Sequence, residues 1–561
     1  MKGLSTLDVL VFVLYFILVA GYGYWIYLKK KKAVQDTKDF FLAEGSLTWW
    51  AIGASLIASN ISAEQFIGMS GEGFFVGTAV AAYEWIAALA LVIIAVWFMP
   101  IYLKNQIFTM PQFLTRRYNE TVSLIMAIFW LFLYVFVNLT SILYLGAVAI
   151  NGLLGGDYLH IVMVALAVFA LIITLGGMKV IGYTDVIQVA VLIIGGLATT
   201  YMALIIVSEK FGLGRDVVAG FNTLLQQAPD HFHMILEKPG PDAPQEQIDK
   251  YMVLPGIAMY FAGQWIVNLN YWGCNQYITQ RALGADLQTA RTGILFAAFL
   301  KLMMPVIVML PGIAAYVLYK NGHLPQLAGG SKDGAYSAIL GFLPSGLKGL
   351  SIAALTAAIV ASLAGKVNSI STIFTLDIFK KYMRQDADEQ KLVLIGRIVI
   401  FISMFVAVVF TWNDTLGIGG EGGFTFIQKY TGFISPGVFA VFMLGMFWKR
   451  TTGAAAVAGV ISGFLLSIFF NNYAPSLLGH ETILYTAFPN GKGEYEIPFL
   501  INMGWSFFFT LALMVGISLT GPKVNPKAFI FESGIFRMSR SVQVLVVIIL
   551  LMLTALYVRF W

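Results

Sequence analysis

The chain has 561 residues, of which 59% are hydrophobic and 11% charged. This composition excludes an ordinary soluble protein, because apolar runs of about 20 residues, the length that crosses about 30 Å of hydrocarbon, recur along the whole chain. The single cysteine, Cys274, excludes a disulfide framework within the chain, and the absence of Walker, CxxC and Ser/His/Asp patterns argues against an enzyme or an ATP-driven pump. The sequence therefore predicts an all-α polytopic membrane protein.

Fourteen membrane-spanning helices are predicted along the chain. They lie near residues 6–28, 48–70, 77–103, 121–150, 158–176, 184–207, 253–277, 293–319, 349–378, 394–412, 423–446, 453–471, 498–520 and 541–559. The first of them could be a signal peptide, since Lys2 precedes an apolar run. The lysine block 29–32 that follows favours a helix whose N-terminus lies outside, because such a block resists translocation.

This orientation places both termini on the extracytoplasmic side of a cell (inner) membrane. The predicted cytoplasmic loops then carry most of the 35 lysine and arginine residues, Arg281 among them. The net charge of +6 is explained by this topology and indicates no nucleic-acid partner. The longest loop, 208–252, is predicted to cap a cavity from outside, and the glycine-rich stretch 417–423 to form a flexible turn.

Several polar residues lie inside the predicted spans, where charges are costly and usually functional. The ionisable ones are Glu64, Glu84, Asp185, Lys301 and Lys366, and the amides at similar depth are Asn60, Gln65, Asn268, Asn270 and Gln428. Hydrogen bonding between helices could account for any one of them. Together they favour a polar cavity in a transporter, a channel or a membrane sensor.

The stretch IASNISAEQFIGM, residues 57–69, predicts a break in the second span. Its SAEQ segment has the S-x-x-Q pattern of a capping box, which marks the start of a helix, although short patterns of this kind also occur by chance. Two half-helices, 48–58 and 63–70, would then meet at mid-membrane. Unwound backbone survives there only inside protein or beside a cavity, where its free carbonyls can bind a cation.

Ten strings, taken in order, resemble the sodium/solute symporter family. They are IGASLIASNISAEQFIGMSG, YEWIAAL, FVNLTSILYLG, TDVIQV, YWGCNQYITQR, FAAFLK, LPGIAAYV, AAIVASLA, STIFTLDI and YTGFISPG. The resemblance is greatest to the bacterial sodium/galactose cotransporter, a relative of the animal sodium/glucose cotransporters. It implies a leucine-transporter-like fold with two inverted repeats of five helices, 48–207 and 253–446, whose first helices are broken. The second break is expected near Asn268 to Tyr271. An extra helix and linker (1–47), the loop 208–252 and three C-terminal helices (447–561) complete the chain.

The same resemblance implies sodium-coupled import of a neutral monosaccharide by alternating access. The residues that match sugar-binding positions are Gln65, Glu84, Asn268, Lys301 and Gln428. Their carboxylate, amide and ammonium groups suit the hydroxyls of a pyranose. Tyr271 matches an aromatic inner gate under the ring, and Met69, Tyr83 and Phe424 match the apolar outer gate.

For sodium, the resemblance implies the backbone carbonyls of Ala58, Ile61, Ala358 and Ala361 together with the hydroxyl of Ser362. Hard oxygen ligands without a carboxylate suit a monovalent cation. Asp185 matches an acidic residue on the sodium exit route or beside a second sodium site. Sodium and the sugar are thus the expected small-molecule partners, with the lipid bilayer around them.

Three residues depart from the sodium/galactose pattern. Ala87 and Ala361 stand where serines are found, and Lys366 stands one turn after Ser362 where no cation is normal. Lys366 could reach cytoplasmic water, could pair with Asp185 in place of a second sodium ion and so enforce one sodium per sugar, or could replace sodium altogether. Ala364 and Gly365, where hydroxyls would serve a second ion, favour one sodium.

The substrate class also has alternatives. Glu84 disfavours anionic solutes, but a polyol such as myo-inositol would fit as well as galactose or glucose. A solute sensor that does not transport is the competing class on the same fold. Glu64, next to Gln65, is expected to cap a helix start and not to face the sugar.

Overall fold

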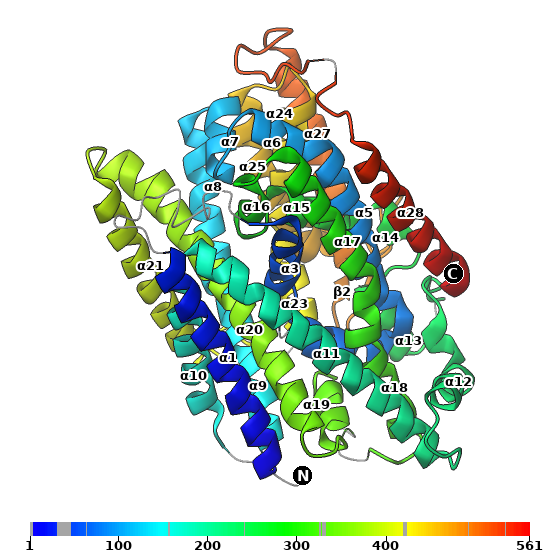
Figure 1. Cartoon of the computed structure of the whole chain (residues 1–561). Coiled ribbons are helices and arrows are strands. Elements are labelled where there is room, and N and C mark those ends of the chain that lie inside the picture. The colour runs from blue at the N-terminus through cyan, green and yellow to red at the C-terminus, as the bar shows by residue number, and fades with distance from the viewer. Residues whose placement is uncertain are drawn as a thin grey trace.

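The computed structural model describes residues 4–30, 47–62, 64–154, 157–240, 242–324, 327, 332–418, 423–491, 493–532 and 534–561. Within these residues the fold is almost entirely helical, and a single hairpin provides the strands (Figure 1). Lys31, Lys32 and Lys38, which carried part of the orientation argument, and residues 419–422 of the predicted glycine-rich turn lie outside the described residues.

Long helices cross the molecule from end to end, joined by shorter ones. The α-helices are α1 Thr6–Lys30, α3 Trp49–Asn60, α4 Ser70–Val76, α5 Ala82–Ile93, α6 Met99–Lys104, α7 Met110–Arg117, α8 Glu120–Phe132, α9 Thr140–Leu154, α10 Leu159–Thr174, α11 Met178–Lys210, α12 Val217–Gln227, α13 Gln245–Val253, α14 Ala258–Phe261, α15 Gly263–Cys274, α16 Gln276–Leu283, α17 Leu287–Val308, α18 Leu310–Lys320, α19 Gly334–Gly341, α20 Leu347–Thr372, α21 Glu389–Thr411, α23 Gly423–Gly432, α24 Ser435–Phe447, α25 Gly453–Ile468, α26 Ala474–Leu478, α27 Phe499–Leu519 and α28 Arg540–Phe560. Wider or tighter turns occur at η2 Glu64–Met69, η3 Gly77–Ala81, η4 Ile94–Phe98, η5 Leu133–Leu139, η6 Pro229–Phe232, η8 Ile373–Met383 and η9 Phe469–Tyr473, and the hairpin pairs β1 Phe488–Pro489 with β2 Tyr495–Glu496.

Ten of the described helices are long and apolar enough to cross a membrane, or up to twelve if each of two bent pairs forms one span. The two pairs bend by 83° before α15 and by 53° between α23 and α24. The predicted span 158–176 corresponds to the shorter apolar helix α10, and the second half of the predicted span 48–70 runs on into the next one as Glu64–Lys104. The polytopic helical class is confirmed, whereas the count of fourteen spans stays a prediction.

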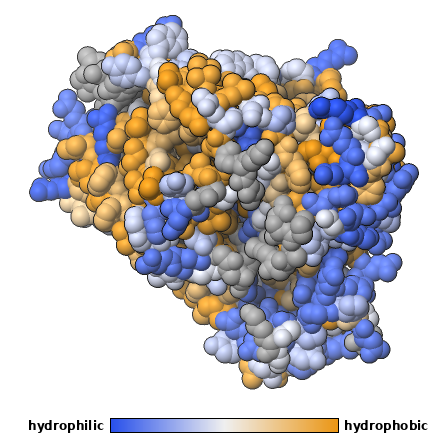
Figure 2. Space-filling model, turned by 90° about the horizontal axis from the view of Figure 1, so that it is seen from below, coloured by the Kyte–Doolittle hydropathy of each residue, from blue (hydrophilic) through white to orange (hydrophobic). Residues whose placement is uncertain are grey.

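Apolar side chains cover the outer helices. Leu10, Leu14 and Ile17 of α1, Phe401 of α21 and Leu551 of α28 are each more than half exposed. Seen from the end at which the chain begins, broad hydrophobic areas flank hydrophilic ones (Figure 2). A soluble protein would bury such surface, so these faces are suited to lipid.

The helices that matter most for a site lie inside this apolar shell. α3 packs along α17 and α11, and α20 packs along α11 at the centre of the bundle (Figure 1). Glycines permit the closest approach: a Cβ on Gly53 of α3 would lie 2.7 Å from the Gly293 carbonyl, and one on Gly293 would lie 2.8 Å from the Trp49 carbonyl. Such close backbone contact is typical of helices packed within a membrane.

Two long loops pack together at one end of the molecule. In the first, at 208–252, Gln245 donates to the Pro489 carbonyl of the hairpin at 2.9 Å, and Tyr251 packs edge-on against Phe488. The C-terminal end of α28 joins them, since the Met234 amide donates to the Phe560 carbonyl at 2.8 Å. These contacts hold the loops as one layer over α4 and α18.

His231 of η6 anchors this layer to the segment that follows the predicted break. Its ring stacks on Tyr316 with a centroid distance of 3.9 Å, its Nε2 lies 3.1 Å from the Phe74 carbonyl, and only 4% of the residue is exposed. Burial lowers the pKa of His231 from 6.5 to about 4. The imidazole is therefore neutral in the folded protein at neutral pH.

Acidification is expected to weaken this anchor. The unfolded loop takes up a proton below pH 6.5 and the folded loop only near pH 4, so the free energy of unfolding should fall by up to about 3 kcal/mol across that range. The measurement is thermal melting of the detergent-solubilised protein from pH 7 to pH 4. A His231→Phe variant keeps the ring stacking and removes the titration, so its melting temperature should depend less on pH; equal slopes for both proteins would contradict the assignment.

Candidate functional site

The predicted break in the first core helix is present. α3 ends at Asn60, Ile61 has extended dihedral angles (φ −79°, ψ 111°), and the chain becomes helical again at Glu64. One half of the predicted capping box forms: the Ser62 amide donates to Gln65 Oε1 at 3.4 Å, while Ser62 Oγ has no hydrogen-bond partner within the described part of the chain. The second half-helix starts as a π turn, which is wider than an α-helical turn. The Gln65 side chain therefore caps a wider turn than the capping-box pattern predicts.

The break frees two carbonyls that sequence analysis assigned to sodium. In a continuous helix the Ala58 carbonyl would accept from the Ser62 amide, which donates instead to Gln65 Oε1. The Ile61 carbonyl would accept from the Gln65 amide, which bonds to the Ser62 carbonyl at 3.1 Å. Both carbonyls are buried and lack their regular donors, which is the state that a cation ligand requires.

Helix α20 meets the break at the predicted hydroxyl. Ser362 Oγ donates to the Ser59 carbonyl at 3.0 Å, and Ala358, Ala361 and Ser362 are all fully buried. The side chains of this face are small, so backbone oxygens of α20 can approach the break. These residues fit a small cation with oxygen ligands.

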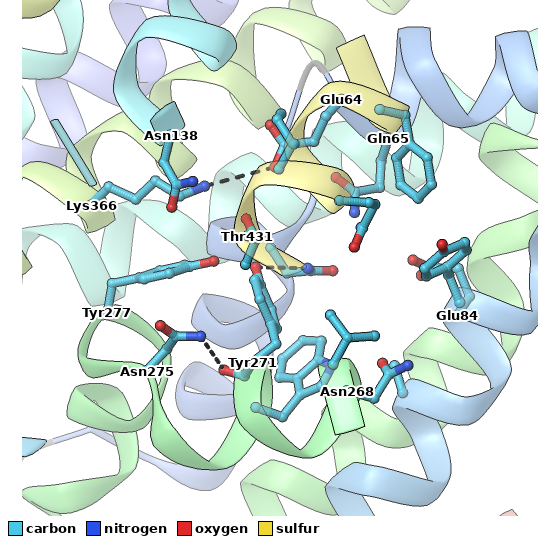
Figure 3. A pocket seen from close by; sticks show the side chains of 18 of the residues that line it. Glu64, Gln65, Glu84, Asn138, Asn268, Tyr271, Asn275, Tyr277, Lys366 and Thr431 are labelled. Carbon is cyan, nitrogen blue, oxygen red and sulfur yellow. Dashed lines mark hydrogen bonds and ion pairs between the residues drawn. The ribbon is translucent and has the colours of Figure 1, made fainter. Parts of the chain in front are cut away.

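A polar cavity opens beside the break (Figure 3). Its lining residues come from nine helical elements and from the junction between α15 and α16: Asn60, Glu64, Gln65, Tyr83, Glu84, Ala87, Leu133, Asn138, Val267, Asn268, Tyr271, Trp272, Asn275, Tyr277, Lys301, Lys366, Phe424, Ile427, Gln428 and Thr431. All five residues predicted to bind sugar are among them. They come from three parts of the chain that are more than 100 residues apart in sequence, and the fold brings all of them to the same space.

One wall carries a buried ion pair. Lys301 Nζ lies 2.5 Å from Glu84 Oε2, and both side chains are at most 3% exposed. Lys301 also lies over the Trp272 ring at 5.4 Å. The pair is neutral as a unit and still offers ammonium hydrogens and a second carboxylate oxygen, so it can bind hydroxyl groups without favouring an ion.

The predicted gate residues lie at two sides of the cavity. Tyr83 and Phe424 pack edge-on with centroids 5.1 Å apart, and Met69, which is fully buried, does not line the cavity itself. On the other side Tyr271 accepts a hydrogen bond from Asn60 Nδ2 at 2.9 Å, which ties it to the end of α3. The first contact closes the space with rings, and the second connects Tyr271 to the break.

The second interruption lies later than expected. Asn268 to Tyr271 are inside α15, and the chain leaves the helix at Asn275 (φ −91°, ψ 130°) before α16 begins. The Asn275 amide explains the position: its Nδ2 donates to the Tyr271 carbonyl at 3.2 Å, while its Oδ1 accepts from Tyr134 Oη at 3.1 Å. A side chain thus replaces the lost backbone donor.

The expected pairing of Lys366 with Asp185 is wrong. Asp185 accepts from Ser55 Oγ at 2.5 Å and faces Arg281 at 3.8 Å, and both charged residues are at most 2% exposed. Arg281, predicted in a cytoplasmic loop, is held inside the bundle by Ser55 and by the Tyr277 carbonyl. Asp185 thus pairs with the Arg281 guanidinium, and Lys366 pairs with another carboxylate.

That carboxylate is Glu64. Lys366 Nζ lies 3.8 Å from Glu64 Oε1, and Lys366 is 1% exposed, so it does not reach water. Figure 3 shows Glu64 pointing into the cavity toward Lys366. The capping role expected for Glu64 is therefore not observed, because the π turn directs its side chain away from the helix start. Four further polar residues line the cavity without having been predicted to do so, and each lies within one of the strings that resemble the family: Asn138, Asn275, Tyr277 and Thr431.

Comparisons with known proteins agree with this geometry. The sodium:solute symporter family matches residues 40–463. The chain is 41% identical over 575 residues to a sodium/glucose cotransporter of Vibrio parahaemolyticus, covering 100% of this chain and 99% of that protein. It is 33% identical over 488 residues to sodium/myo-inositol cotransporter 2 of Mus musculus, covering 83% and 70% of the two chains.

The fold is also similar to that of a substrate-bound, outward-open Na⁺-coupled sialic acid symporter. The TM-score is 0.76 at 19% sequence identity, with 93% of this chain and 99% of that chain covered. The relatives by sequence are cotransporters and not enzymes. This multi-pass membrane protein belongs to the sodium:solute symporter family.

Proposed function

We propose that this symporter imports a neutral monosaccharide similar to galactose or glucose, driven by one sodium ion per sugar. The observation that carries the proposal is the cavity beside the broken helix, where the Glu84–Lys301 pair faces the amides of Gln65, Asn268 and Gln428. Each group binds hydroxyls, and the wall bears no net charge. The 41% identity to a sodium/glucose cotransporter supports the same substrate class.

The sugar would lie between Tyr271 and the ring pair of Tyr83 and Phe424. A pyranose ring can stack on an aromatic face, while its hydroxyls reach the carboxylate and amides around it. Ala87 lines the cavity without offering a hydroxyl, so one contact that a serine would supply is absent. The relative affinities for different hexoses should therefore depend on the five predicted sugar-binding side chains, which are Gln65, Glu84, Asn268, Lys301 and Gln428.

Sodium would bind at the break, to the carbonyls of Ala58, Ile61, Ala358 and Ala361 and the hydroxyl of Ser362. Two observations support a single ion. Asp185, the carboxylate that could serve a second one, faces Arg281, and a Cβ on Gly365 would lie 2.5 Å from the Arg281 guanidinium. The Arg281 guanidinium thus lies where a second sodium ion would need oxygen ligands. Asp185 remains a candidate for the sodium exit route.

One ion is energetically sufficient. Moving one charge through 100 mV contributes about 2.3 kcal/mol, and a tenfold gradient contributes about 1.4 kcal/mol. Together these sustain roughly 500-fold accumulation of a neutral sugar.

The transport cycle we propose is alternating access in the inner membrane, with fourteen spans and both termini extracytoplasmic. The repeats 48–207 and 253–446 would move against each other around the cavity, the linker 1–47 and helices of 447–561 would flank them, and the loop 208–252 would lie outside. Sodium would hold α3 against α20, and its inward release would loosen Tyr271 through Asn60.

The decisive experiment is counterflow of labelled galactose, glucose and myo-inositol into proteoliposomes, with and without sodium. We expect sodium-dependent counterflow of a hexose. Uptake of myo-inositol alone would favour the second candidate substrate, which the 33% identity to a myo-inositol cotransporter supports. Solute binding without counterflow would instead indicate a sensor.

Alanine variants of the polar wall test the sugar site. Gln65→Ala and Glu84→Ala should reduce hexose counterflow to background, because each removes a group that lines the cavity, while the melting temperature of Gln65→Ala stays close to that of the parent. The double variant Glu84→Gln/Lys301→Met neutralises both members of the buried pair together. It therefore tests the loss of the charges without the destabilisation that one unpaired buried charge would cause. Normal counterflow in Gln65→Ala and Glu84→Ala would refute their assignment.

Sodium stoichiometry and the role of Ser362 can be measured together. Uptake at increasing sodium concentration should give a Hill slope near one, and Ser362→Ala should raise the half-saturating sodium concentration about tenfold, as expected for loss of one ligand. Ser371→Ala is a matched control on the same helix, since among the described residues the Ser371 hydroxyl donates to the Gly396 carbonyl, away from the break. A Hill slope near two, or equal effects of the two variants, would contradict the one-ion site.

A further inference from the structure

Lys366 is placed between the proposed sodium site and the sugar cavity. Its Nζ lies 3.3 Å from Ser362 Oγ, 3.8 Å from Glu64 Oε1 and 4.9 Å from the centre of the Tyr277 ring. Ser362 is a proposed sodium ligand, and the other two partners line the cavity. The ammonium therefore contacts both parts of the transport machinery.

Ser362 cannot serve both cations with the same geometry. Its hydrogen is donated to the Ser59 carbonyl, and its oxygen accepts from Lys366 Nζ. A sodium ion at the break would also need a lone pair of that oxygen, and it would repel the ammonium. Glu64 offers the ammonium another position, because its Oε2 is buried with no hydrogen-bond partner among the residues that the structure describes, and its Oε1 is already 3.8 Å away.

Glu64 is adjacent to Gln65 on the same π turn. The Gln65 side chain already bonds to the Ser62 amide, so the conformation of this turn sets both the break and the amide that faces the sugar. Lys366 is on α20, so a shift of its ammonium toward Glu64 would draw this turn and α20 together. The contact thus links the ion site to the sugar wall by a short path of named atoms.

We propose that Lys366 and Glu64 form the element that couples sodium to solute: the ammonium occupies Ser362 in the absence of sodium, and sodium displaces it onto Glu64, which positions Gln65. This proposal rests on the proposed function and adds its coupling. Lys366 is then a competitor that weakens sodium binding and in return makes solute binding depend on sodium. Glu64 acts through Lys366, by drawing the ammonium away from Ser362.

The two members of the pair should have opposite effects on sodium. Removing the competitor in Lys366→Met should lower the half-saturating sodium concentration about tenfold, and Glu64→Gln, which leaves the ammonium on Ser362, should raise it about tenfold. In the Lys366→Met background, Glu64→Gln should change it less than about twofold, because Glu64 then has no ammonium to draw away. Simple through-space repulsion would instead give additive effects.

The experiment measures binding of ²²Na⁺ and of labelled galactose to the purified full-length chain at one fixed pH. We expect sodium to raise galactose affinity strongly in the parent protein and weakly in Lys366→Met, even though Lys366→Met binds sodium more tightly. Melting temperatures establish that all three variants are folded, and ²²Na⁺ binding gives an answer for any that bind no sugar.

Three results would overturn the proposal. These are shifts of sodium affinity in the same direction for both single variants, additive effects in the double variant, or unchanged sodium enhancement of galactose binding in Lys366→Met. A different failure identifies the proposed function as wrong: the parent protein would bind ²²Na⁺ with the expected variant pattern and yet bind no hexose.

Discussion

The structure depends on one local constraint, which is that backbone amides and carbonyls released in a membrane interior must find partners. α3 ends at Asn60 and the chain becomes helical again at Glu64, so two carbonyls lose their regular donors inside the protein. Gln65 satisfies one freed amide, and Ser362 of α20 donates to the neighbouring Ser59 carbonyl. The close packing of α3, α17 and α20 follows, since only helices in direct contact can shield such a break from lipid.

The second constraint is the cost of buried charge, which the chain meets by pairing. Glu84 with Lys301, Asp185 with Arg281, and Glu64 with Lys366 are ion pairs whose members are at most 10% exposed. Each pair joins segments far apart in sequence, and the members of two pairs, Glu84 with Lys301 and Glu64 with Lys366, line the cavity. Pairs of this kind contribute less to stability than to specificity, because desolvation offsets most of their attraction. Their positions therefore point to function.

Residue patterns predicted the parts of this site that depend on local chemistry. The S-x-x-Q segment located the break to within about two residues, and polarity in apolar runs identified eight of the twenty residues that line the cavity. Long-range partners could not be predicted in this way: Lys366 is one turn from Ser362 by helix geometry, but whether it meets Glu64 or Asp185 depends on the position of Arg281, which sequence placed in a loop. The wide turn at Glu64 and the interruption at Asn275 likewise depend on side chains of other helices.

Neutral pairing also bears on how the membrane potential acts. In these three pairs the buried cations and anions balance, so they would contribute little net charge movement when a carrier without sodium reorients. A bound sodium ion would then be the principal charge that crosses, and the potential would act on the loaded step. If the Lys366 ammonium only moves between Ser362 and Glu64, it adds a rearrangement inside the protein and not a charge carried across. A tethered cation can thus transmit the arrival of sodium to the sugar wall without reducing the energy available for accumulation.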